Sequence, residues 1–219
     1  MSYLFLTISL ITGYLIGSIN GAVILSKTFY GSDIREHGSG NAGTTNMLRT
    51  FGKKAALFTL LIDLFKGVFA CLIAFFFAKI LGTGHEFFGY PMGTGHVLLA
   101  ALGAVLGHNW PVYFNFHGGK GVLVSFSVML FIAPVPALIA LGIFIILVAI
   151  TKYVSLGSIV AAAAFPALQY AIGGWLAGTK GFTAAFFVSI IICAMMIIRH
   201  HANIKRLLTK SESKISFKK

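Results

Sequence analysis

The sequence has little charge and very few acids. Only 10% of its 219 residues are charged, and only five of them are Asp or Glu, whereas a soluble domain carries roughly 25% charged residues. The mean hydropathy is +0.91, and 58% of the residues are hydrophobic. This composition excludes an ordinary soluble domain and predicts a protein that is embedded in a lipid bilayer.

Several kinds of chemistry are missing from the chain. The sequence has no paired carboxylates, no His/Cys spacing typical of a metal site and no nucleophile elbow. Cys71 and Cys193 both lie inside apolar runs, so we expect buried thiols and neither a disulfide nor a metal site. The sequence therefore predicts no metal and no cofactor, and the polar residues that remain are suited to binding phosphate.

Long apolar runs predict membrane helices. A full span needs about 20 residues, and some of the runs are shorter, which predicts half-spans whose non-helical ends are shielded by protein. The first run lacks a basic n-region and a cleavage pattern, so we expect it to be retained. We predict an all-α integral membrane protein, a single domain over residues 1–219, formed as a compact bundle of about seven transmembrane helices. The predicted helices cover residues 3–25, 55–80, 94–107, 122–133, 137–150, 157–172 and 182–198.

The distribution of basic residues predicts the orientation. With the C-terminus placed inside, 14 of the 17 Lys and Arg residues are cytoplasmic, including the basic tail from about residue 199. Lys79 and Lys180 lie outside, and Lys66 lies within the second span. The positive-inside rule then predicts an outside N-terminus and a cytoplasmic C-terminus. Nucleic acid is excluded as a partner because the basic clusters flank membrane spans and no soluble domain could present a groove.

The same orientation brings four polar stretches to the cytoplasmic surface: residues 31–49, 107–121, 151–158 and 199–206. The most informative is FNFHGGKGV, residues 114–122. Its glycines can adopt backbone angles that other residues avoid, so consecutive N–H groups can converge on an anion, and Lys120 adds a positive charge. The alternative is a tight turn with a lysine at the lipid headgroups. It is not a Walker A loop, because Phe114 and Gly121 occupy the positions of its first Gly and its Ser/Thr.

A second polar run, GSGNAGTTN, covers residues 38–46 and precedes Arg49. Its small side chains suit an anion or a polyol, which makes Asn41 and Asn46 candidate phosphate ligands. Arg49 offers a planar fork that can bind a phosphate. The alternatives are a surface loop that caps the second span and an arginine that contacts headgroups.

Two further stretches add candidates. Ser155 and Ser158 begin the predicted sixth helix and could be helix caps or ligand hydroxyls. His200 and Asn203 are three residues apart at the end of the seventh helix, so they share a face, although a basic tail is usually only a membrane anchor.

Two charged residues lie inside the second span. Asp63 and Lys66 are one helical turn apart, and we expect them to pair and to hold this helix against its neighbours. For His108 we expect a hydrogen-bonded role that fixes the Gly-rich loop, with a proton carrier as the alternative.

Four segments together resemble a known family. GSINGAVI, DIREHGSGNAGTTNMLRTFGKK, LGHNWPVYFNFHGGKGV and RHHANIKRLL resemble the bacterial acyl-phosphate:glycerol-3-phosphate acyltransferases (the PlsY family). The resemblance covers most of the chain in matching order. It departs from the usual pattern at Asn20, where Pro is common, and at Thr44, where Ala is usual. It implies a seven-span enzyme of the bacterial inner membrane, with a cytoplasmic active site, that acts in phospholipid biosynthesis.

The resemblance also implies an activity. The enzyme would transfer a fatty acyl group from acyl phosphate to the 1-position of sn-glycerol 3-phosphate, giving lysophosphatidic acid and phosphate. Its partners would be these two substrates and membrane lipid, and the chain is compatible with a monomer. The alternative function is a transporter of a phosphorylated or anionic solute. It is disfavoured because the polar groups lie at one surface and no internal repeat is found.

The motifs assign residues to this activity. Gly118, Gly119, Lys120 and Gly121 would surround the acyl-phosphate group, and one of Ser155 and Ser158 would join the site. No protein base is evident, so we hypothesise that a substrate phosphate accepts the hydroxyl proton. The candidate catalytic residues are Ser39, Arg49, Lys120, His200 and Asn203.

Overall fold

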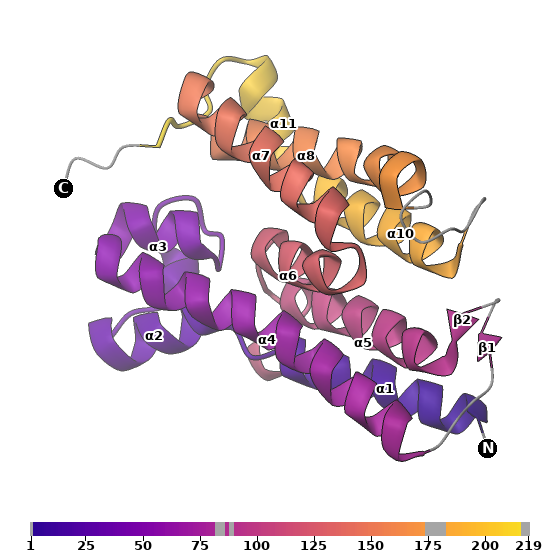
Figure 1. Cartoon of the computed structure of the whole chain (residues 1–219). Coiled ribbons are helices and arrows are strands. Elements are labelled where there is room, and N and C mark those ends of the chain that lie inside the picture. The colour runs from indigo at the N-terminus through magenta and orange to yellow at the C-terminus, as the bar shows by residue number, and fades with distance from the viewer. Residues whose placement is uncertain (1, 82–85, 88–89, 174–182, 216–219) are drawn as a thin grey trace. The chain divides into compact units, whose positions relative to one another are not determined.

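The computed structural model describes residues 2–81, 86–87, 90–173 and 183–215, and nearly all of them are helical (Figure 1). The chain forms two compact units, residues 1–128 and 129–219, and each is described by itself. Helix α6, Val122–Ile132, runs across the boundary between them.

The first unit contains most of the helices and one short pair of strands. In this pair Glu86 lies opposite Pro91 and Phe87 opposite Tyr90 in an antiparallel ladder. The elements are α1 (Ser2–Gly17), α2 (Gly21–Tyr30), the 3₁₀ turn η1 (Ile34–Glu36), α3 (Thr44–Phe51), α4 (Lys53–Ile80), β1 (Glu86–Phe87), β2 (Tyr90–Pro91), α5 (Met92–Asn109) and η2 (Val112–Phe114).

The first predicted helix, residues 3–25, corresponds to one candidate membrane span, Tyr3–Tyr30, but this span is interrupted and not a single continuous helix. The apolar stretch breaks after Gly17, and α2 starts at Gly21. The side chain of Asn20 accepts a hydrogen bond from Val23 N at 3.1 Å and so caps the new helix. At the other end, Gly31 adopts φ 62° and ends α2 before the polar loop.

Helices α1 and α5 pack closely through glycine (Figure 1). A Cβ atom at Gly13 would lie 2.2 Å from the carbonyl oxygen of Ala100, and one at Gly103 would lie 2.2 Å from that of Leu10. No side chain fits at these distances. The small residues therefore allow the two backbones to touch, as is typical of membrane helices.

A small apolar core lies under the polar loop between α2 and α3. Val23, Ile34 and Met47 are fully buried together, and Phe114 packs against them from the segment before the Gly-rich loop. The polar loop between α2 and α3 is thus held by hydrophobic contacts as well as by hydrogen bonds.

The second unit is built around α8. This helix, Val154–Leu168, continues into the π turn Gln169–Gly173 and packs against the three other helices of the unit. Those helices are α7 (Pro134–Thr151), α10 (Ala184–Arg199) and α11 (His201–Leu208). The residues after α11 fold back, and Ile215 N donates to the carbonyl oxygen of Lys152 at 2.8 Å.

Five described segments are long and apolar enough to cross a membrane: Tyr3–Tyr30, which includes α1 and α2, Lys53–Ile80, Gly95–Phe114, Pro134–Thr151 and Val154–Ile172. A sixth is found if α10 and α11, which meet at 55°, are counted as one. Helices α5 and α7 each have 18 residues and are longer than the predicted 94–107 and 137–150. Among the predicted helices that the structure describes, α6 stays short at 11 residues. The number of crossings and their orientation stay predictions. Cys71 and Cys193 are buried free thiols, as expected.

Candidate functional site

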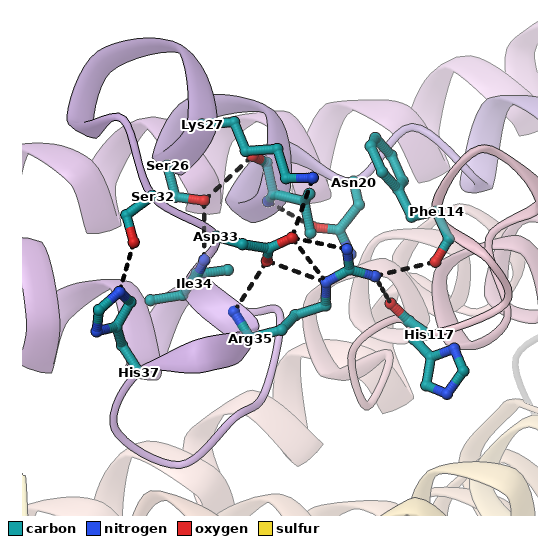
Figure 2. Close-up of polar contacts among 11 residues, drawn as sticks. Asn20, Ser26, Lys27, Ser32, Asp33, Ile34, Arg35, His37, Phe114 and His117 are labelled. Carbon is teal, nitrogen blue, oxygen red and sulfur yellow. Dashed lines mark hydrogen bonds and ion pairs between the residues drawn. The ribbon is translucent and has the colours of Figure 1, made fainter.

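Arg35 joins the two polar loops of the first unit. Its Nη1 donates to the carbonyl oxygens of Phe114, at 2.9 Å, and His117, at 3.2 Å. Its Nε and Nη2 donate to the carboxylate of Asp33, and Lys27 forms a further ion pair with the same carboxylate (Figure 2). The hydrogen bond from Arg35 holds the pKa of Asp33 well below its usual range. The loop after α2 is therefore fastened to the segment that leads into the Gly-rich loop.

This fastening acts on a segment with unusual backbone angles. Asn115 and Phe116 have φ of 54° and 57°, a left-handed conformation that is unfavourable for residues other than glycine. Arg35 binds the carbonyl oxygens on both sides of this pair. Such a conformation persists only where its surroundings enforce it, and Arg35 supplies part of that enforcement.

The Gly-rich loop lies against the end of α5. A Cβ atom at Gly118 would lie 2.0 Å from the carbonyl oxygen of His108, and one at Gly119 would lie 2.2 Å from Nε2 of the same residue. Glycine is therefore required at 118 and 119 by lack of space, and not by backbone angle as expected. Only Gly121 of the three has a positive φ, 79°. In addition, Gly119 N donates to the carbonyl oxygen of His108 at 3.1 Å, so this N–H is directed at α5.

The run GSGNAGTTN touches the Gly-rich loop. The carbonyl oxygen of Ala42 would lie 2.8 Å from a Cβ atom at Gly119, and Asn20 donates to the same oxygen at 3.4 Å. The two polar stretches predicted to converge within this unit therefore lie side by side. Arg49, on α3, and Lys120 are both half-buried.

Asn46 shapes the first of these stretches. Its amide is 1% exposed; Oδ1 accepts from Ser39 N at 3.0 Å, and Nδ2 donates to the carbonyl oxygens of Ile34 and His37. These bonds favour a structural role for Asn46 over the predicted phosphate contact. They leave the Ser39 side chain at an exposed position, while Asn41 is half-buried.

The charged pair in α4 forms as predicted, and His108 joins it. Lys66 Nζ lies 2.8 Å from Asp63 Oδ1, 2.8 Å from His108 Nδ1 and 2.9 Å from the carbonyl oxygen of Ile19. The charges thus connect α4, α5 and the break between α1 and α2. The sequence indicated the pairing within α4, but nothing in it indicated that His108 or Ile19 would complete the group.

The second unit has its own polar cluster, centred on Glu212. Glu212 Oε1 accepts from Ser155 Oγ at 3.0 Å and from Asn203 Nδ2 at 2.8 Å, and Oε2 accepts from Arg206 Nε at 2.7 Å. Burial opposes ionisation of this carboxylate, but the hydrogen bonds from Arg206, Asn203 and Ser155 lower its pKa overall. Sequence reasoning missed Glu212, although its being one of only five acids was a signal.

The remaining candidates of this unit differ in their surroundings. Ser158 Oγ donates to the carbonyl oxygen of Val154 in its own helix, whereas Ser155 belongs to the Glu212 cluster. His200 is buried, and its Nδ1 donates to the carbonyl oxygen of Met196 at 2.7 Å. That these residues share a pocket with the Gly-rich loop stays a prediction.

The fold and these clusters define a class: a helical integral membrane protein whose cationic and glycine-rich loops gather at helix ends. Within the described ranges, no three His, Cys, Asp or Glu side chains are grouped as metal ligands would be.

Comparison with known proteins identifies the family. The sequence model of the glycerol-3-phosphate acyltransferases matches residues 7–210. Glycerol-3-phosphate acyltransferases from Clostridioides difficile and Thermoanaerobacter pseudethanolicus are 44% and 40% identical, over 95% and 98% of both chains.

Solved structures agree with this identification. The crystal structure of PlsY, an integral membrane glycerol 3-phosphate acyltransferase, in its glycerol 3-phosphate form matches with a TM-score of 0.79 and 33% identity, over 96% of each chain. The lysophosphatidic acid form matches with a TM-score of 0.75 and 32% identity, over 97% of this chain and 96% of that one. The chain belongs to the glycerol-3-phosphate acyltransferase family. The predictions of an all-helical integral membrane protein, of this family and of an acyltransferase are confirmed.

Proposed function

We propose that the protein transfers a fatty acyl group from acyl phosphate to the sn-1 hydroxyl of glycerol 3-phosphate, giving lysophosphatidic acid and phosphate for phospholipid biosynthesis. We further propose that it acts in the bacterial inner membrane, with its site on the cytoplasmic side.

One observation carries the proposal most directly. The Gly-rich loop lies against Ala42 of the second polar run, and Arg35 ties the segment before this loop to the loop after α2. Two stretches rich in amide and cationic donors are thereby held together in one unit. Such an arrangement suits a pair of phosphorylated substrates. The solved structure of PlsY in its glycerol 3-phosphate form supports the identity of the acceptor.

The chemistry needs positioning more than a reactive protein group. Acyl phosphate is a mixed anhydride, so phosphate is already a good leaving group. The sn-1 hydroxyl attacks the carbonyl carbon, the new ester bond forms, and the bond from carbon to the phosphate oxygen breaks. Lys120 and amides of the Gly-rich loop, apart from that of Gly119, which donates to His108, would stabilise the charge on the departing phosphate. Arg49 would hold the phosphate of the acceptor.

The hydroxyl proton would pass to a substrate phosphate. In the first unit, the carboxylate of Asp33 is ion-paired with Arg35 and Lys27, and that of Asp63 is ion-paired with Lys66. A carboxylate that is held in this way is a weak general base. This supports transfer of the proton to a substrate phosphate. Either the departing phosphate takes the proton and leaves as hydrogen phosphate, or the phosphate of the acceptor takes it and the product carries it away.

A turnover assay tests the proposal. Purified full-length protein in detergent is supplied with glycerol 3-phosphate and either palmitoyl phosphate or palmitoyl thioesters. We expect lysophosphatidic acid and one equivalent of phosphate from palmitoyl phosphate only. Efficient turnover of thioesters alone would overturn the choice of donor. Because transport requires a closed compartment, product formation in detergent also excludes the transporter alternative.

Variants test the roles of the cations and of the proton acceptor. Lys120→Gln and Arg49→Gln should each lower kcat/KM by about a hundredfold or more, since one charge-assisted contact contributes roughly 1.5–3 kcal/mol and each 1.4 kcal/mol is tenfold. Lys79→Gln, at an exposed lysine near the end of α4, is the matched control and should retain activity. If a carboxylate or histidine variant keeps substrate affinity, loses all turnover and shifts the pH profile, a protein base exists and the substrate-assisted step is wrong.

A further inference from the structure

The ammonium group of Lys66 is held by three partners inside the protein. The side chains of Lys66 and Asp63 are 4% and 3% exposed, so they have little contact with bulk solvent. Three acceptors surround Nζ: Asp63 Oδ1 at 2.8 Å, His108 Nδ1 at 2.8 Å and the carbonyl oxygen of Ile19 at 2.9 Å. An ammonium group has three N–H bonds and no lone pair. His108 Nδ1 and the carbonyl oxygen of Ile19 are its hydrogen-bond acceptors, and Asp63 Oδ1 is its ion-pair partner.

The contact between Lys66 Nζ and His108 Nδ1, at 2.8 Å, indicates the tautomer of His108. Because Nδ1 faces a group that can only donate, Nδ1 must accept, and a neutral ring then carries its proton on Nε2. The carboxylate of Asp63 does not compete for a proton on Nδ1, since its Oδ1 lies 3.6 Å from that nitrogen, beyond hydrogen-bond distance.

The Nε2 edge of the ring lies directly against the Gly-rich loop. A Cβ atom at Gly119 would come within 2.2 Å of His108 Nε2, and the carbonyl oxygen of His108 accepts from Gly119 N at 3.1 Å. The same residue thus contacts the loop through its ring and through its backbone. The ring edge that carries Nε2 is therefore in direct contact with Gly119.

We propose that Asp63, Lys66 and His108 are positioning residues for the Gly-rich loop. The buried ammonium fixes His108 as the Nε2–H tautomer, and the ring in this form holds the loop in the conformation that binds the substrate phosphate. That this phosphate belongs to acyl phosphate rests on the proposed function. The assignment of the His108 tautomer does not depend on the proposed function.

Nitrogen NMR tests the tautomer without any assay of activity. Full-length protein in detergent is labelled with ¹⁵N-histidine, and the signals of His108 are identified by their loss in His108→Gln. We expect one protonated and one unprotonated ring nitrogen, with Nδ1 unprotonated. In the double variant Asp63→Asn/Lys66→Met, which removes both buried charges together, this fixed pattern should be lost. A protonated Nδ1 in the unmodified protein, in either a cationic ring or the other tautomer, would overturn the proposal.

Kinetics test the effect on the loop. His108→Leu should raise the KM for palmitoyl phosphate about tenfold or more and change kcat less, because the loop is displaced and the reacting groups are not removed. His108→Gln, whose amide places an N–H close to the position of Nε2, should restore most of the affinity. Equal KM for the Leu variant and the unmodified protein, or no difference between the Leu and Gln variants, would contradict a positioning role.

The NMR experiment and the kinetic assay together distinguish a failure of this proposal from a failure of the proposed function. If the expected tautomer is found but the unmodified protein does not turn over palmitoyl phosphate, the proposed function fails alone. If turnover is normal and Nδ1 is protonated, the positioning proposal fails alone. Should His108→Leu not fold, the double variant is measured in the same kinetic assay, and an unchanged KM in that variant contradicts the proposal.

Discussion

Arg35 shows how one side chain can organise a site that it does not enter. It makes hydrogen bonds to Asp33 and to two carbonyl oxygens of the segment before the Gly-rich loop. The planar guanidinium can reach all of these groups at once, whereas a lysine could not, because its donors radiate from a single atom. Asp33 accepts from Arg35 and from Lys27, so the two cations on one carboxylate allow a direct comparison.

Replacing Arg35 should destabilise the protein far more than replacing Lys27. Arg35→Gln should lower the free energy of unfolding by about 2–3 kcal/mol, since Asp33 keeps only Lys27 and the backbone N–H of residue 35 as partners, and the carbonyl oxygens of Phe114 and His117 lose their bonds from the guanidinium. Lys27, whose side chain is 53% exposed, should contribute less than about 1 kcal/mol. Thermal unfolding of Arg35→Gln and Lys27→Gln in the same detergent measures the difference, and equal losses would contradict the assigned role of Arg35.

Glu212 should make the stability of the second unit depend on pH. Its folded pKa lies below the ordinary value of 4.5, so its stabilisation is complete above about pH 4.5 and is lost as the pH falls through the folded pKa. Glu212→Gln should therefore reduce the unfolding temperature at pH 6–7, and the gap to the unmodified protein should narrow below pH 4.5. Glu36→Gln, at an exposed carboxylate, is the control. A gap that stays constant from pH 7 to pH 3.5 would contradict the prediction.

At the scale of elements, the contact between α1 and α5 shows how small residues in the sequence determine which helices can pack closely. Glycines on both helices leave no room for a side chain. In a bilayer, lipid is as apolar as leucine, so close van der Waals packing is what favours one helix neighbour over another. The position of α5 in turn sets the position of His108, on which the Gly-rich loop rests.

A pair of glycine substitutions tests this packing. Gly103→Ala should destabilise the protein by about 1–3 kcal/mol, because the new methyl group would overlap the backbone of α1. Gly142→Ala, in α7, introduces the same methyl group where no atom lies within 4 Å, and should be neutral or should stabilise by up to about 1 kcal/mol. Unfolding of both variants in detergent gives the comparison; a similar effect of the two would show that helix propensity, and not the contact, decides.

At the scale of the whole molecule, the charge distribution and the polar stretches point to the same side of the membrane. Fourteen of 17 basic residues are assigned to the cytoplasm, and the loops of the proposed site are among the segments that carry them. A site on that side would have direct access to a water-soluble phosphorylated substrate and to an acyl chain in the bilayer.

Labelling of introduced cysteines tests the orientation. Cysteine at Lys54 or Lys210, both exposed, should react with a membrane-impermeant maleimide only after the cells are permeabilised. Cysteine at Lys180 should react in intact cells. The native Cys71 and Cys193 are buried, which keeps the background low. Reaction at Lys54 in intact cells would reverse the predicted topology.

Much of the architecture followed from local patterns. Apolar runs and the bias of Lys and Arg act additively along the chain, so they indicated the membrane environment and helices that correspond to α4, α6, α7 and α10. The motifs within residues 31–49 and 107–121 indicated the family and led to the prediction that these loops bind phosphate. These signals survive without tertiary information because solvation by lipid acts on each segment separately.

Other features depend on contacts between distant residues, which no local pattern specifies. Arg35 and Phe114 are 79 positions apart, and Lys66 and His108 are 42 apart. The break at Asn20 was hidden because hydropathy is continuous across it, while the backbone is not. The folded chain alone reveals that Gly118 and Gly119 are needed for space, and that Glu212 holds Ser155 and Asn203. A close approach of two segments depends on how whole helices pack, and a residue's neighbours along the chain do not contain that information.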